Sequence, residues 1–126
     1  MYFYKLLAVG IGGLLGSVAR YITVKAVDQK LNAVFPYGTL TVNILGSFVL
    51  GLIYTIALRK TGMSENWRLF LGAGFCGGFT TFSSFAWENF TLLEQKLIGT
   101  SLAYMSVSLV AGLLALSFGV WLGRFL

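Results

Sequence analysis

The sequence predicts an all-α membrane protein with four transmembrane helices. The chain of 126 residues is 57% hydrophobic and only 10% charged, whereas soluble domains carry about 25% charged residues. Stretches 31–58, 69–87 and 97–123 contain no formal charge, and a helix needs about 20 largely apolar residues to cross a bilayer. We therefore expect a single four-span domain, 1–126, with spans at about residues 3–25, 37–58, 67–92 and 98–123.

The first span is apolar except for Lys5 and Arg20. A secretory signal peptide is an alternative, with Lys5 as its basic flank and residues 17–19 as a small-residue cleavage site. Three further spans and a glycine-rich face argue for a packed helix instead. Gly12 and Gly16 lie four residues apart on that face, the spacing at which membrane helices approach closely.

Arg20 lies near the end of the first span. A membrane-embedded arginine costs about 2.5–3.5 kcal/mol unless it reaches the interface or a partner. Two interpretations stay open: Arg20 anchors the helix at the interface, or it attracts ions to a vestibule.

Residues 31–38 are expected to form a loop before the second span, because Pro36 and Gly38 are typical of turns and helix starts. Thr39 and Asn43 follow at positions i and i+4 and share a helical face. The Asn43 amide offers two donors and one acceptor. A buried asparagine of this kind either joins helices or binds substrate.

The third span combines paired glycines with four hydroxyl side chains. Gly77 and Gly78 are followed by Thr80 and Thr81, and this composition disfavours a helix. We therefore expect a mid-membrane break near 77–82. Opened backbone at membrane depth is tolerated only inside protein or along a wet cavity, and its carbonyls can coordinate a cation.

Aromatic residues recur every three positions around that break, at Phe79, Phe82 and Phe85. Such a stripe usually packs against other helices. A phenyl ring also has an electropositive edge, so rings that face a path could assist an anion. Glu88 ends the uncharged run near an interface, where it can cap the helix, pair with a basic residue or line a vestibule.

The fourth span places Tyr104 and Ser108 one turn apart on one face, which Gly112 continues without a polar group. Taken together, the spans offer neutral donors and almost no charge. The donors are Thr39, Asn43, Thr80, Thr81, Ser83, Ser84, Tyr104 and Ser108. Neutral donors suit a small anion that must enter and leave again, because a fixed positive charge deep in the path would trap it.

Composition excludes several other classes of protein. The chain has no histidine, one cysteine (Cys76) and four acidic residues. These numbers argue against histidine-based catalysis, an internal disulfide and a multi-cysteine metal site, so we expect no enzyme. The net charge of +5 is thinly spread, which indicates anchors at the lipid bilayer interface and no nucleic acid.

Basic residues show only a weak bias between the two sides of the predicted membrane domain. One side carries Lys5, Arg59, Lys60, Arg68 and Arg124, and the other carries Lys25, Lys30 and Lys96. Orientation follows the Lys and Arg excess. So weak a bias permits insertion both ways round.

Three segments in three spans resemble the bacterial CrcB/Fluc fluoride-channel family. They are GGLLGSVAR (12–20), PYGTLTVN (36–43) and GFCGGFTTFSSF (74–85). The resemblance implies an antiparallel, dual-topology homodimer with two separate fluoride pathways. It implies passive fluoride export across the bacterial inner membrane, which reduces fluoride toxicity.

The same resemblance implies roles for particular residues. Asn43 corresponds to a pore asparagine, and the ring edges of Phe82 and Phe85 face fluoride. The carbonyls of Gly77 and Thr80 correspond to ligands of a structural sodium ion at the dimer centre. Tyr104 and Ser108 correspond to hydroxyls along the fluoride track, and Arg20 to an arginine near the vestibule. The predicted fluoride pathway comprises Asn43, Phe82, Phe85, Tyr104, Ser108, Thr81, Ser83 and Arg20.

Two departures from the family pattern concern hydroxyl groups. The family often has Ser-Thr where this chain has Ser83 and Ser84, and Gly112 stands where some members carry another hydroxyl. A small multidrug transporter is the alternative function, but it needs a deep carboxylate, and the first span has none. A third possibility is a non-transporting assembly subunit, in which the glycines and hydroxyls only pack.

Overall fold

The computed structural model describes residues 1–59 and 63–126, and helices make up most of these ranges. Four helical segments are long and apolar enough to cross a membrane, which confirms the predicted all-α, four-span class. Three of them are the single helices α1 (Tyr2–Leu31), α2 (Tyr37–Arg59) and α6 (Ile98–Gly123). The remaining segment covers Glu65–Glu94.

Helix α1 is longer than the predicted span. The predicted span ends at residue 25, but the helix continues to Leu31. This part of the sequence contains no proline or glycine, and its charged residues tolerate a helix well. The helix ends at Asn32, which adopts a left-handed conformation with φ 46° and ψ 54° and donates its N–H to the Asp28 carbonyl over 2.8 Å.

The third span changes its helical geometry along its length. It begins with α3 (Glu65–Arg68), continues as the π-helix η1 (Leu69–Cys76), and then forms one turn of α-helix, α4 (Gly77–Phe79). Thr80 and Thr81 are extended, with φ/ψ of −91°/158° and −151°/121°. Helix α5 (Phe82–Glu94) follows directly. The π-helical stretch is a feature that the composition of the segment did not predict.

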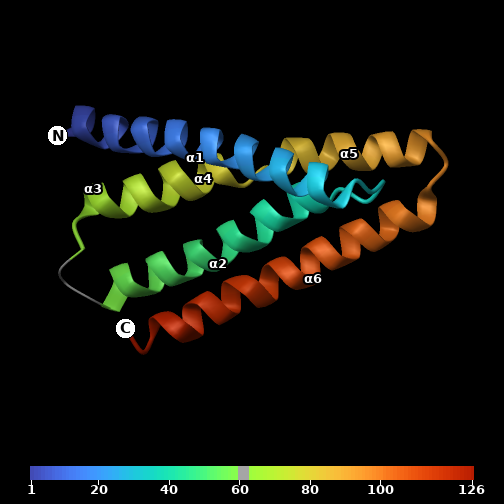
Figure 1. Cartoon of the computed structure of the whole chain (residues 1–126). Coiled ribbons are helices and arrows are strands. Elements are labelled where there is room, and N and C mark those ends of the chain that lie inside the picture. The colour runs from blue at the N-terminus through green and yellow to red at the C-terminus, as the bar shows by residue number, and fades with distance from the viewer. Residues whose placement is uncertain (60–62) are drawn as a thin grey trace.

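The helices pack as two close pairs (Figure 1), with α1 against η1 and α4, and α2 along α6. Backbone meets backbone where α1 crosses the third span. A Cβ added at Gly12 would meet the Phe70 carbonyl oxygen, and one at Gly16 would meet that of Phe75. The close-packing role expected for these two glycines is therefore confirmed.

Both chain termini lie at the same end of the molecule (Figure 1). At this end the Lys5 ammonium pairs with the Glu65 carboxylate over 2.8 Å. The Arg59 side chain donates to the backbone carbonyl of Arg124 near the C-terminus. These contacts place Lys5, Arg59 and Arg124 on one side, as the charge analysis predicted, whereas Lys60 lies outside the described residues.

Candidate functional site

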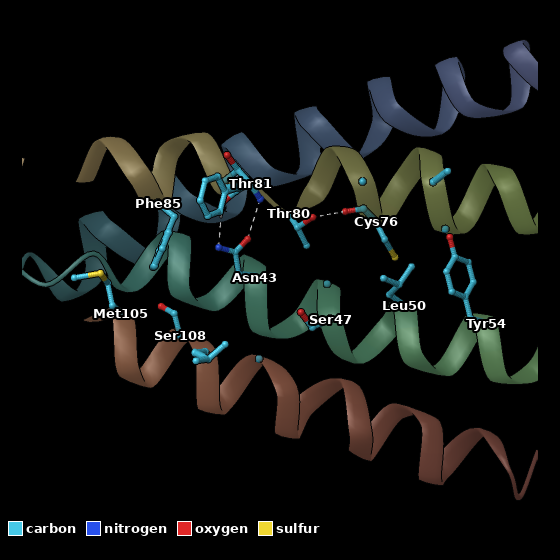
Figure 2. Close-up of a pocket in the computed structure, with 17 residues that line it drawn as sticks. Asn43, Ser47, Leu50, Tyr54, Cys76, Thr80, Thr81, Phe85, Met105 and Ser108 are labelled. Carbon is cyan, nitrogen blue, oxygen red and sulfur yellow. Dashed lines mark hydrogen bonds between the residues drawn. The ribbon is translucent and has the colours of Figure 1, made fainter. Parts of the chain in front are cut away.

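A groove of about 670 Å³ lies between α2, the third span and α6 (Figure 2). Its lining is predominantly apolar, and the residues described in it include no charged side chain. It brings together seven of the ten residues predicted to bind fluoride or sodium: Asn43, Gly77, Thr80, Thr81, Phe82, Phe85 and Ser108. Arg20, Ser83 and Tyr104 lie outside the lining.

Asn43 binds the extended backbone at Thr81 through both ends of its amide (Figure 2). Its Oδ1 accepts the Thr81 N–H over 2.8 Å, and its Nδ2 donates to the Thr81 carbonyl over 3.2 Å. An amide nitrogen carries two hydrogens, so one donor remains after these bonds. Asn43 thus joins two helices and still has an N–H to offer to the groove.

These side-chain bonds replace two hydrogen bonds of a continuous helix. In an α-helix the N–H of residue i+4 donates to the carbonyl of residue i. In a continuous helix the Thr81 N–H would donate to the Gly77 carbonyl, but here it donates to Asn43 Oδ1. Likewise, the Ser84 N–H would donate to the Thr80 carbonyl, but here it donates to the Thr81 hydroxyl over 3.1 Å. The carbonyls of Gly77 and Thr80 have therefore lost their helical donors.

Arg20 contacts the same break from the side of α1. Its Nε donates to the Gly78 carbonyl over 3.1 Å. In a continuous helix this carbonyl would accept from the Phe82 N–H. Basic side chains commonly satisfy the last carbonyls of a helix in this way. This is a third role for Arg20, beyond the interfacial and vestibule interpretations.

Replacing Arg20 with glutamine is expected to lower ion flux about tenfold, by a similar factor at low and high salt. The shorter side chain cannot reach the Gly78 carbonyl, and a hydrogen bond to a charged group contributes about 1.5–3 kcal/mol. Lys25→Gln, on the same helix, serves as the control. A loss confined to low salt would instead show that Arg20 acts by attracting ions, because salt screens that effect.

A second polar cluster lies beyond the groove, around Glu88. The Thr39 hydroxyl donates to one carboxylate oxygen over 2.6 Å, and the Tyr104 hydroxyl donates to the other over 2.7 Å. Thr39 is 1% exposed and Tyr104 is fully buried. Of the three roles considered for Glu88, none anticipated this pairing with two hydroxyls.

Spacing in the sequence does contain a signal for this cluster. Thr39 lies one turn from Asn43, Glu88 one turn from Phe85, and Tyr104 one turn from Ser108. Each member of the cluster is therefore the next residue along a helical face that already carries a predicted pathway residue.

Aromatic rings connect the groove with this cluster. Phe82 is 78% exposed and its ring centroid lies 5.8 Å from that of Phe85. The Phe85 ring lies 5.0 Å from the Tyr104 ring, with an angle of 53° between their planes. The two phenylalanines and Tyr104 thus form a continuous series that begins at an exposed ring and ends at a buried one.

The hydroxyl groups near the rings differ in their partners. Within residues 1–59 and 63–126 the buried Ser108 hydroxyl has no hydrogen-bond partner, although a buried polar group usually finds one. Ser83 is exposed, and its hydroxyl lies 3.3 Å from that of Thr81. Gly112 lines the groove, and a Cβ added there would meet no atom within 4 Å.

Cation binding by side chains has little support in the described ranges 1–59 and 63–126. These contain no group of three or more His, Cys, Asp or Glu side chains able to hold a metal ion. A cation in this region would depend on backbone carbonyls, and those of Gly77 and Thr80 are among the carbonyls released from helical bonds.

The sequence of the chain matches a known protein family. Residues 7–120 match the family model described as CrcB-like protein, Camphor Resistance (CrcB). A protein named fluoride-specific ion channel FluC from Chlorobium chlorochromatii (strain CaD3) is 46% identical over 121 residues, which cover 96% of this chain and 93% of the relative. The FluC protein of Chelativorans sp. (strain BNC1) is 42% identical over 121 residues, covering 96% and 97%.

A third FluC protein, from Bacteroides fragilis, is 43% identical over 123 residues, covering 95% of this chain and 96% of the relative. The match to the family model extends across all four helical spans. The chain therefore belongs to the CrcB-like protein family.

Proposed function

We propose that this chain is the subunit of a fluoride-selective channel that passively exports fluoride across the bacterial cell membrane. Its relatives are named for fluoride conduction, and its four apolar helices suit a multi-pass membrane protein. A passive channel needs no chemical step, so the residues of the groove act by offering donors and excluding other ions.

The observation that carries this proposal is the set of unused donors beside the aromatic rings. The buried Ser108 hydroxyl has no hydrogen-bond partner among the described residues, and Asn43 retains one N–H after its two bonds to Thr81. The rings of Phe82 and Phe85 line the same groove. A small anion would be held by neutral donors and positive ring edges, which bind it without trapping it.

The complete channel is an antiparallel dimer of two copies inserted in opposite orientations. One side of the groove is open, and Phe82 at its edge is 78% exposed, which leaves room for a partner. The weak charge bias of the connections allows both orientations to arise from one chain. Each copy contributes one groove, and each groove forms one fluoride pathway in the dimer.

A structural sodium ion fits the break in the third span. The carbonyls of Gly77 and Thr80, freed from helical donors by Asn43 and Thr81, are hard oxygen ligands of the kind that sodium prefers. Two copies would supply two such carbonyls each. The ion would neutralise carbonyl dipoles that otherwise repel one another and would be unsatisfied in hydrocarbon, and it would take no part in conduction.

Fluoride efflux from liposomes tests the channel function. Purified protein reconstituted into vesicles loaded with potassium fluoride is expected to release fluoride when potassium is allowed to leave through an ionophore, and chloride-loaded vesicles are expected to retain their anion. Equal release of the two anions, or release of neither, would contradict the proposal. Uptake of a quaternary ammonium dye driven by a pH gradient would instead indicate a multidrug transporter.

The sodium content of the purified dimer tests the cation site independently of flux. Protein dialysed against a sodium-free potassium buffer is expected to retain one sodium ion per dimer, measured by atomic emission. Asn43→Leu should lose it, because the Thr81 N–H is then free to bond the Gly77 carbonyl. Protein from which all sodium dialyses away would refute a buried structural site.

A further inference from the structure

The series of aromatic rings that starts in the groove does not end at Tyr104. The ring of Phe35 lies 5.4 Å from that of Tyr104, at an angle of 75°, in an edge-to-face arrangement. Phe82 and Phe85 come from α5 and Tyr104 from α6, whereas Phe35 belongs to the loop that joins α1 to α2. Four rings from three parts of the chain thus follow one another.

The exposure of the rings varies along this series, and the rings at its two ends are the more accessible ones. Phe82 is 78% exposed beside the groove, Tyr104 is fully buried, and Phe35 is half-buried. One side of the Phe35 ring therefore packs on Tyr104 while another side remains accessible. The hydroxyls of Thr39 and Tyr104 already donate to the Glu88 carboxylate, so an anion at this end would depend on ring edges. Phe35 is the last ring of the series before the solvent.

Backbone contacts hold Phe35 in place. Pro36 follows it and disfavours a helical conformation at residue 35. The Tyr37 N–H donates to the Phe35 carbonyl over 2.8 Å, and the two rings lie 4.8 Å apart. The next residue, Gly38, donates its N–H to a carboxylate oxygen of Asp28 over 2.9 Å. These contacts fix the chain directly after Phe35.

We propose that Phe35 is a further residue of the fluoride pathway, whose ring edge receives the anion as it passes between Tyr104 and the solvent. This inference rests on the proposed channel function and extends it. A phenyl ring has a positive edge and a negative face. An edge-to-face pair in which one member is half-exposed offers an anion a positive edge, and neither ring carries a positive charge that would retain the ion.

Replacement of Phe35 by leucine tests the role of the ring. Leucine keeps an apolar side chain over Tyr104 but has no positive edge, so fluoride efflux per dimer is expected to fall about five- to tenfold. Phe35→Tyr restores the ring and should recover most of the flux. Phe118→Leu, in the separate aromatic pair with Phe48, is the matched control, and Phe85→Ile provides the reference for loss of a groove ring.

Several outcomes would overturn the inference. One is a Phe35→Leu dimer that conducts within about twofold of the parent, since the effect expected from a lost ring edge is larger. Another is a Phe35→Tyr variant as slow as Phe35→Leu, because the ring would then not be the cause. Phe35→Met replaces the leucine variant if that variant does not yield an intact dimer on sizing.

Failure of this inference differs from failure of the channel function. If the parent protein releases no fluoride, the channel function itself is wrong. If the parent and Phe118→Leu conduct while Phe35→Leu conducts equally well, only the role of Phe35 is refuted.

Discussion

Asn43→Asp is expected to lower fluoride flux by more than about a hundredfold. A loss of this size is seen when an enzyme loses one hydrogen-bond donor to a developing anion. Ionised aspartate is nearly isosteric with asparagine but only accepts hydrogen bonds. The substitution removes the N–H left over for the anion and places a negative charge in its path. It also sets a carboxylate oxygen against the Thr81 carbonyl, which Asn43 Nδ2 now binds over 3.2 Å.

Efflux from liposomes measures this effect, with Asn66→Asp as the matched control because Asn66 lies exposed in α3. Size exclusion should still give a dimer, since the Oδ1 bond to the Thr81 N–H survives in aspartate. A mutant that conducts at the parental rate would remove Asn43 from the pathway and leave it only a role in joining α2 to the third span.

Gly16→Ala should cause a large loss of stability for the addition of a single methyl group. The new Cβ would contact the Phe75 carbonyl oxygen and lie 3.0 Å from the Phe79 backbone nitrogen. Both neighbours are backbone atoms, so α1 must move away from the third span. Overpacking of this kind costs about 1–3 kcal/mol or more, and we expect a marked fall in the thermal midpoint and in the yield of dimer.

Gly10→Ala on the same helix provides the control, because a Cβ there meets no atom within 4 Å. The two variants add the same methyl group and change helix propensity alike. Their difference in thermal midpoint in detergent therefore measures the packing at Gly16 alone. Equal midpoints would mean that the helices can separate at this crossing without cost.

The sequence allowed the four spans to be located because uncharged stretches are long and sharply bounded. The fourth span was predicted at 98–123, the bounds of α6. The end of α1 was missed because charged residues such as Lys25 and Lys30 mark the edge of the apolar region and not the end of the helix. The π-helix at Leu69–Cys76 was missed because its residues equally suit an α-helix.

The candidate site could be predicted as a set of residue types but not as a network. The Asn43 amide was recognised as a donor, yet its bonds to Thr81 depend on the approach of α2 to the third span, which one-dimensional spacing does not encode. Ser83 was included because it belongs to a run of hydroxyls, but its side chain is exposed and lies outside the groove lining. Phe35 was overlooked because it lies in a loop, outside any helical pattern.

The length of α1 has a consequence for the solvent at one end of the protein. Its 30 residues span about 45 Å at 1.5 Å per residue, whereas the hydrocarbon core of a bilayer is about 30 Å thick. The surplus carries Lys25, Asp28 and Lys30, and through Asp28 it fixes the start of α2. The last turns of α1 thus extend beyond the hydrocarbon core and hold the loop that carries Phe35 in the headgroup region, where water reaches it.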